Sequence, residues 1–134
     1  SSPNDFTLLN GELYFRANDA NHGSELWKTD GTRDGTVMVK DIRSGTSGSS
    51  PNGFTLFNDE LYFSAYDADN GTELWKTDGT LSGTVMVADI WQGSAGSVPR
   101  SNANGAPFIS IGNTIYFRAF ILESDSIEIS IQEK

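Results

Sequence analysis

The segment ELWKTDGT at residues 25–32 occurs again, unchanged, at residues 73–80, and this repetition decides the fold. Aligning residues 1–48 with residues 49–96 requires no gap and gives 33 identical positions out of 48. A second shared segment, GTVMV, follows at 35–39 and 83–87. A fixed period of about 40–50 residues is typical of propellers, solenoids and repeat arrays.

The last part of the chain begins as a third unit and then diverges. Pro99 follows Pro51 and Pro3 at a step of 48, but six inserted residues place IYF at 115–117, a step of 54 after LYF at 61–63. No third ELWKTDGT occurs. We therefore divide one structural domain into unit 1 (1–48), unit 2 (49–96) and a degenerate third unit with a C-terminal strand (97–134). A capping repeat and a truncated protein would both give this pattern.

Turn residues divide each unit into four short β-prone segments. The turns contain Asn-Gly or Asn-Asp, Asp-Gly and a linker of Gly, Ser and Pro. In unit 1 the expected strands are FTLL (6–9), ELYFRA (12–17), ELWKT (25–29) and TVMVKDI (36–42). Their middles are apolar on both faces, which indicates a sheet buried between two neighbours. The sequence thus predicts an all-β fold of tandem four-stranded antiparallel blades, propeller-like, with two full units and a partial third.

Composition narrows the classes of partner. The 134 residues include 9 Lys and Arg against 18 Asp and Glu, for a net charge of −9, and no cysteine. An acidic chain is a poor ligand for nucleic acid or anionic lipid, and thiolate metal sites and disulfides are excluded. No apolar run approaches the roughly 20 residues that span a bilayer, so membrane insertion is not expected. The chain opens with Ser-Ser-Pro, which is consistent with removal of an upstream segment.

A family resemblance rests on the repeated motif. ELWKTDGT, followed two residues later by GT and then by VMVKDI or VMVADI, resembles the ELWxxDGT repeat family of bacterial secreted and surface proteins, and LYFRA and LYFSA match its second strand. The resemblance covers residues 1–96 and, in part, 97–120. It implies propeller-like β blades and a secreted or cell-surface location in bacteria, and it brings no catalytic residues. The TDGT turn is also similar to the Asp-box turn of sialidase-type propellers, where it locks a hairpin.

Two acidic loops are candidate calcium sites, with calcium as the one cofactor the sequence suggests. Oxygen-bearing residues at alternate positions before a Gly are typical of short loops that wrap Ca²⁺, and a Glu follows each loop. The candidate ligands are Asp19, Asn21 and Glu25 in unit 1, and Asp67, Asp69 and Glu73 in unit 2. The alternative is a polar surface loop. Asp30 and Asp78 likewise have two possible roles, which are contact with a ligand and closure of their own turn.

The tryptophans allow a glycan-stacking role or a packing role. Trp27 and Trp75 lie inside a strand that repeats intact, which favours packing. Trp91 replaces Arg43 in a linker, so we single it out as a candidate ligand-binding residue. His22 is the only histidine, and its counterpart in unit 2 is Asn70. A Ser-His-Asp or Cys-His site would depend on this single residue.

These patterns predict a protein that is not an enzyme. Acids that recur once per unit, such as Glu25 with Glu73 and Asp41 with Asp89, are typical of fold maintenance, whereas catalytic sites are usually single. We expect an extracellular binding or adhesion module that recognises a glycan or protein through blade-end loops. The alternative is a structural surface-layer or filament component. Because propellers need four to eight blades, we also expect a homo-oligomer, preferably a dimer with six blades, with a filament as the alternative.

Overall fold

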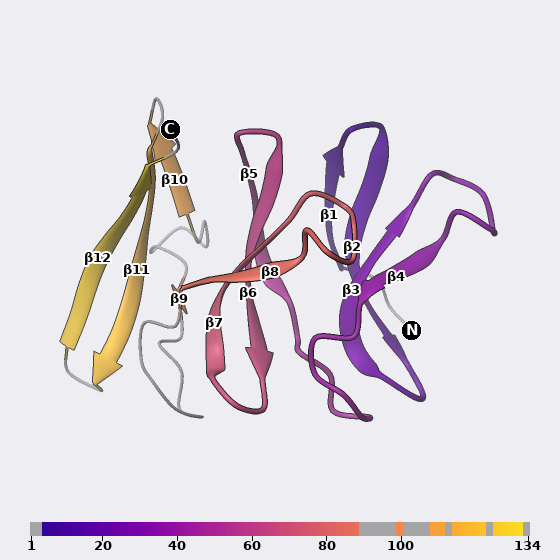
Figure 1. Cartoon of the computed structure of the whole chain (residues 1–134), viewed down its shortest axis with the longest axis horizontal. Helices are drawn as coiled ribbons and strands as arrows, with labels where there is room; N and C mark the ends of the chain where they lie inside the picture. Colours follow the sequence, from indigo (N-terminus) through magenta and orange to yellow (C-terminus); the bar gives the residue numbers. More distant parts are fainter. Residues whose placement is uncertain (1–3, 89–98, 101–107, 112–113, 123–124, 133–134) are drawn as a thin grey trace.

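The computed structural model describes residues 4–88, 99–100, 108–111, 114–122 and 125–132. The protein is all-β over these residues, and its strands form three antiparallel sheets that stand side by side (Figure 1). No helix in the described ranges is long and apolar enough to cross a membrane.

The two complete units form sheets of the same topology. Sheet 1 consists, in spatial order, of β1 (Asn4–Leu9), β2 (Glu12–Asp19), β3 (Gly23–Thr29) and β4 (Val37–Lys40). Sheet 2 consists of β5 (Asn52–Phe57), β6 (Glu60–Asp67), β7 (Gly71–Thr77) and β8 (Val85–Ala88). The prediction of a four-stranded antiparallel sheet for each unit is confirmed. The fourth strand is shorter than expected, ending at Lys40 in unit 1, and the second extends to Asp19.

The hairpin turns account for the registers. Asn10 and Gly11 both have positive φ, at 51° and 80°, and Asn58 and Asp59 follow with 50° and 60°. Two consecutive residues of this kind form the tight turn whose twist matches antiparallel strands. As a result Tyr14 pairs with Thr7 and Lys28. In sheet 2, Tyr62 pairs in the same way with Thr55 and Lys76.

The third sheet is built around β11 (Thr114–Leu122). On one side β11 pairs with β12 (Asp125–Gln132), so the C-terminal segment supplies the third strand of this sheet. On its other side it pairs with β10 (Phe108–Ile111) and β9 (Pro99–Arg100). Arg118 of β11 pairs with Arg100 of β9 in the same way as Ser64 of β6 pairs with Asn52 of β5 in sheet 2. In β5 the register then shifts between Asn52 and Thr55. The six inserted residues therefore enter where sheets 1 and 2 have only a bulge.

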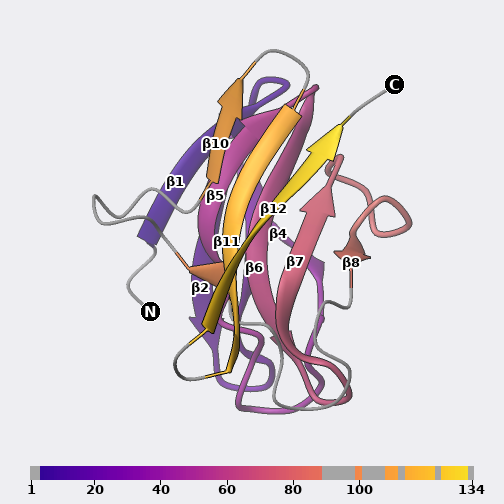
Figure 2. The same cartoon turned by 90° about the vertical axis from the view of Figure 1, so that its left-hand side faces the viewer.

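The hydrophobic core lies between sheets 1 and 2. Side chains on a strand alternate between two faces, and one face of sheet 1 meets the opposite face of sheet 2. Sheet 1 contributes Leu9, Tyr14, Leu26 and Val39, and sheet 2 contributes Leu61, Phe63, Ala65 and Trp75. The first strands of neighbouring sheets also contact each other, β1 with β5 and β5 with β10. Figure 2 shows the third sheet in front of sheet 2 when the molecule is viewed along the stack.

Candidate functional site at the linker end

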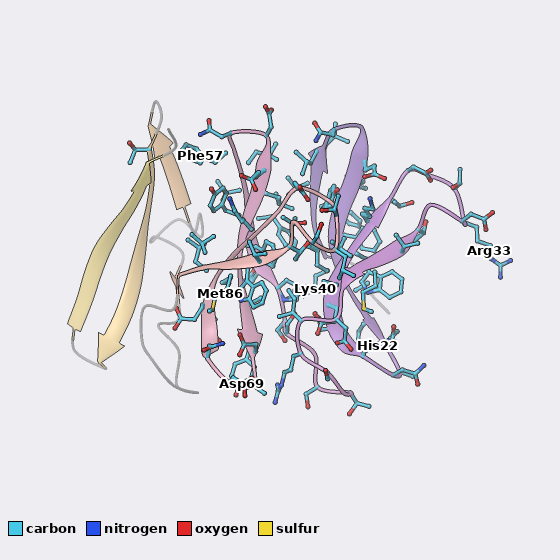
Figure 3. All side chains as sticks on the ribbon, in the orientation of Figure 1. His22, Arg33, Lys40, Phe57, Asp69 and Met86 are labelled. Atoms are coloured by element: carbon cyan, nitrogen blue, oxygen red, sulfur yellow. The ribbon has the colours of Figure 1, made fainter. Side chains whose placement is uncertain are left out.

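One end of the sheets carries the β2–β3 turn, the β6–β7 turn and the linker between β4 and β5, and we call it the linker end. Figure 3 shows His22 and Asp69 at this end and Phe57 at the opposite end. Ser24 and Gly48 form a parallel bridge, and the N–H of Ser50 donates to the carbonyl of Ser24 at 2.9 Å. The turn and the linker, about 25 residues apart in sequence, are therefore adjacent.

The close approach of these two segments depends on two glycines. A Cβ on Gly23 would lie 2.4 Å from the carbonyl oxygen of Thr46, and a Cβ on Gly48 would lie 2.1 Å from the backbone nitrogen of Ser24. Both glycines also have positive φ. Because no side chain fits there, both positions are glycine in unit 1 and again, as Gly71 and Gly96, in unit 2.

A buried carboxylate fixes the linker. Glu25 is fully buried, and its two oxygens accept hydrogen bonds from the N–H groups of Ile42 (3.3 Å), Arg43 (3.1 Å) and Ser49 (3.0 Å). The hydroxyl of Ser49 donates a further hydrogen bond to the same carboxylate. Burial raises the pKa of Glu25, and these donors act in the opposite direction. Because the carbonyl of Ser49 accepts from the N–H of Tyr66 at 2.8 Å, the carboxylate connects β3 through Ser49 to sheet 2.

Arg43 closes the linker on its outer side. Its guanidinium lies 4.4 Å from the ring centroid of Tyr66, within range for a cation–π contact. Its Nη1 also donates to the carbonyl of Gly48 at 3.4 Å. Arg43 is half-buried between the two sheets. Trp91, its counterpart in unit 2 and our candidate ligand-binding residue, lies outside the described residues.

The acidic turns are closed by their own aspartates. One oxygen of Asp19 accepts from the N–H groups of Asn21 (2.8 Å) and His22 (2.7 Å). Nδ1 of His22 lies 3.0 and 2.9 Å from the two oxygens of Asp19. This hydrogen bond lowers the pKa of Asp19 and raises the pKa of His22.

Unit 2 repeats this turn with an amide in place of the imidazole. Nδ2 of Asn70 lies 3.1 and 3.0 Å from the oxygens of Asp67, and the N–H groups of Asp69 and Asn70 donate to the same carboxylate. Because an amide makes the same contacts, His22 has a structural role in its turn that needs no proton transfer.

The candidate calcium ligands do not gather into one cluster. The described residues contain no group of three His, Cys, Asp or Glu side chains placed to hold a metal ion. The Asp19 and Asp67 carboxylates accept hydrogen bonds within their turns, and the Glu25 carboxylate contacts the linker. Glu73 is as completely buried as Glu25. This geometry gives calcium no support, and its binding by these loops stays a prediction.

The TDGT turns form at the opposite end of the strands and are also self-contained. One oxygen of Asp30 accepts from the N–H (2.9 Å) and the hydroxyl (2.6 Å) of Thr32, whose own Oγ1 accepts from the N–H of Gly35 at 2.9 Å. Asp78, Thr80 and Gly83 repeat all three distances. These hydrogen bonds lower the pKa of both aspartates. In both units the aspartate closes its own turn.

The two repeated tryptophans have different environments. Trp75 is 7% exposed and belongs to the core between sheets 1 and 2, whereas Trp27 is only half-buried on the free face of sheet 1. The Nε1 atoms of both are buried without a hydrogen-bond partner among the described residues. Trp75 therefore has a packing role.

The positions at which the units differ concentrate at the linker end. Of the 15 positions that differ between residues 1–48 and 49–96, eight lie in or beside the β2–β3 turn or in the linker. They are Asn18, Asn21, His22, Ser24, Arg43, Ser44, Thr46 and Ser47 in unit 1. Five of these eight side chains are exposed and the other three are half-buried. The linker end thus combines turns whose backbone contacts are the same in both units with side chains that differ between the units.

An open depression lies at the opposite end, between the β1–β2 and β5–β6 turns. Its lining combines apolar and polar side chains and is contributed by Leu8, Leu9, Asn10, Leu56, Phe57, Asn58 and Asp59. Leu8 and Asn10 recur unchanged as Leu56 and Asn58, whereas the positions of Leu9 and Gly11 carry Phe57 and Asp59 in unit 2. Two of the four repeat positions at this depression are therefore common to both units.

No family model, curated protein or solved structure matches the chain.

Proposed function

We propose that the chain is a non-catalytic binding module, exported to the cell exterior, that recognises a glycan or protein through its linker end. The observation that carries the proposal is the division between repeated and changing residues. The repeated polar groups Glu25, Asp30 and Asp78 accept hydrogen bonds from backbone groups around them. The side chains that change between units are exposed or half-buried on the adjoining turns.

The chemistry of this end suits recognition. It offers carboxylates, amides, hydroxyls and a cationic guanidinium on an aromatic ring, which are groups that bind the hydroxyls of sugars or the side chains of a protein. The aspartate turns and the buried Glu25 fix the backbone beneath these groups. A preformed surface loses little conformational entropy on binding, which favours recognition. The export of the protein is supported by the resemblance of its ELWKTDGT segments to secreted repeat proteins.

A matched exchange between the units tests the proposal. Asn21→Asp with His22→Asn installs the unit 2 turn in unit 1, and the hydrogen bonds of Asp67 show that this turn keeps its shape. Arg33→Leu with Asp34→Ser makes the same kind of exchange at the opposite end. On glycan and surface-protein arrays, the first pair should change the binding profile and the second should leave it as in the wild type.

A structural surface-layer or filament component is the second candidate, favoured by the half-buried apolar residues on the free face of sheet 1. Two results together would favour this second function: the wild type binds nothing on the arrays, and the protein polymerises when its solution is concentrated.

A further inference from the structure

The free face of sheet 1 carries the residues that form a core in sheet 2. We call it the outer face and define it by Leu13, Phe15, Ala17, Trp27 and Thr29. The corresponding residues of sheet 2 are Leu61, Phe63, Ala65, Trp75 and Thr77, and all five are buried. The first four belong to the core that sheet 2 shares with sheet 1. On the outer face, Leu13, Ala17, Trp27 and Thr29 are only half-buried. Phe15 is buried beside the ring of Phe6 in its own sheet. Four of the five residues are therefore buried in sheet 2 and left partly open in sheet 1.

The turn that adjoins this face shows the same contrast. In sheet 2 the β7–β8 turn reaches over to sheet 1, whereas the β3–β4 turn of sheet 1 extends away from the other sheets (Figure 1). Thr77 and Thr84 are 0% exposed, whereas Thr29 is half-buried and Thr36 exposed. The sequence TDGT is the same in both turns. The difference arises because sheet 1 lies over one turn and nothing described lies over the other.

The contact between sheets 1 and 2 shows what such a face accepts. The hydroxyl of Tyr14 comes so close to Gly79 that a Cβ at Gly79 would lie 2.2 Å from it. Burial is the main cause that raises the pKa of Tyr14 to about 12. Leu26 and Val39 complete the covering surface. At its edge, Nζ of Lys40 donates to the carbonyl of Thr84 at 3.1 Å and lies 5.7 Å from the ring centroid of Trp75.

From this match we infer that the outer face of sheet 1 docks one further repeat unit of the unit 1 type, which presents a tyrosine, a leucine and a valine at the positions of Tyr14, Leu26 and Val39. That tyrosine would meet Gly31 as Tyr14 meets Gly79. Gly31 has φ +94°, close to the +97° of Gly79, and a Cβ there has open space around it. The outer face thus has the shape of an interface whose other half is absent.

A second copy of this chain does not offer the same surface. The third sheet has Tyr116 in the register of Tyr14 and Tyr62, since it pairs with Ile109 as they pair with Thr7 and Thr55. Two residues further along β11, however, Arg118 pairs with Glu128, where sheet 1 pairs Arg16 with Leu26. The register of the third sheet thus places a charged pair where the covering surface of sheet 1 has its leucine. Terminal repeats that cap an array commonly carry polar residues at such positions.

The sequence at residues 1–4 fits the proposed unit. Ser-Ser-Pro-Asn recurs at 49–52, where the N–H of Ser49 donates a hydrogen bond to the Glu25 carboxylate of the preceding unit. A unit placed ahead of Ser1 would thus present its own glutamate to the same residue types.

The test adds a copy of residues 1–48 directly before Ser1, which recreates the Gly48–Ser49 junction in sequence. Gly31→Asn is compared with Gly45→Asn, because Gly45 has the same φ of +94° and the same open space but lies in the linker. In the unextended chain the two variants should lower the melting temperature alike. In the extended chain Gly31→Asn should lower it by at least about 4 °C more than Gly45→Asn, the shift of an interface clash in a domain of this size.

Three results would overturn the inference. The first is equal melting temperatures for the two variants of the extended chain. The second is an added unit that limited proteolysis removes without changing the melting temperature of the rest. The third is an unextended chain that light scattering finds to be a dimer or filament, which Gly31→Asn dissociates and Gly45→Asn leaves intact. That result would make the third sheet of a second copy the occupant of the outer face.

Discussion

Removing the Glu25 carboxylate tests whether it holds the linker in place. In Glu25→Ala, the N–H groups of Ile42, Arg43 and Ser49 lose their acceptor together with the Ser49 hydroxyl. A buried donor without a partner costs about 1–3 kcal/mol. Water can enter the space that the carboxylate leaves and bond some of these groups. We therefore expect a loss of about 3–5 kcal/mol in the free energy of unfolding, or roughly 10–20 °C in melting temperature.

Glu25→Gln should be much milder, which separates hydrogen bonding from charge. Its amide oxygen can still accept from the N–H groups of Arg43 and Ser49. Its NH₂ replaces the oxygen that accepts from the N–H of Ile42 at 3.3 Å and from the hydroxyl of Ser49, and that hydroxyl can turn to accept from the NH₂. The substitution also removes the penalty of burying a charge, so we expect a change within about 1 kcal/mol. Glu12→Ala is the control. Glu12 forms a partly exposed ion pair with Lys28 at 3.1 Å and accepts from the hydroxyl of Tyr14 at 3.3 Å, two contacts that together are worth about 1–2 kcal/mol.

The assay is urea unfolding followed by tryptophan fluorescence, with hydrogen exchange at the Ser49 amide as the local signal. Because burial raises the folded-state pKa of Glu25 above 4.5, its stabilisation is complete below that pH and is lost as the pH rises through the folded pKa. Glu25→Gln should remove this part of the pH dependence. A Glu25→Ala protein as stable as Glu12→Ala, with a protected Ser49 amide, would refute the role of the carboxylate.

Three further predictions concern single side chains. The Asp19 contact raises the pKa of His22 above 6.5, so the stability that protonated His22 contributes should be lost as the pH rises through its folded-state pKa. In thermal melts between about pH 6 and 8, His22→Asn should lack this decline in melting temperature. Melting temperatures of the wild type and the variant that run parallel with pH would contradict the prediction. Because the pKa of Tyr14 is about 12, absorbance titration should find a tyrosine that stays protonated at pH 11, and Tyr14→Phe should abolish that late step and no other. In Gly83→Ala the new Cβ would lie 2.0 Å from Oδ1 of Asp78, so urea unfolding should show a loss of about 1–3 kcal/mol; a change below about 0.5 kcal/mol would mean that the turn adapts freely.

The strands and their pairing were predictable because turn chemistry and period-2 alternation are local signals. Asn10-Gly11 and Asn58-Asp59 fixed the hairpins, and the C-terminal strand predicted for the third unit is β12, which pairs with β11. Strand ends were less accurate. The fourth strand was expected to reach Ile42, but the N–H of Ile42 bonds to Glu25 instead of to a neighbouring strand.

The partners of Glu25 were not predicted. Its recurrence as Glu73 indicated a role in the fold and its position after the acidic loop suggested a calcium ligand, but neither pattern pointed to the linker, whose donors lie 17 to 24 residues further along the chain. A signal was nevertheless present, because alternation places Glu25 on the same face as Trp27 and opposite Ala17. A charged residue on an apolar face must find several donors or become neutral. The different burial of Thr29 and Thr77 had no such signal, since identical sequences become distinct only through their neighbours.

The way in which the linker is held bears on the proposed function. Glu25 binds the linker through the backbone of Ile42, Arg43 and Ser49, and Gly48 approaches Ser24 without a side chain. The conformation of the linker therefore does not depend on the exposed side chains of Ser44, Thr46 and Ser47. This explains how unit 2 can carry Gln92, Ser94 and Ala95 at the same positions while keeping its buried glutamate, Glu73. A surface whose backbone is fixed from beneath can change its side chains without changing its shape, which is what a recognition surface requires.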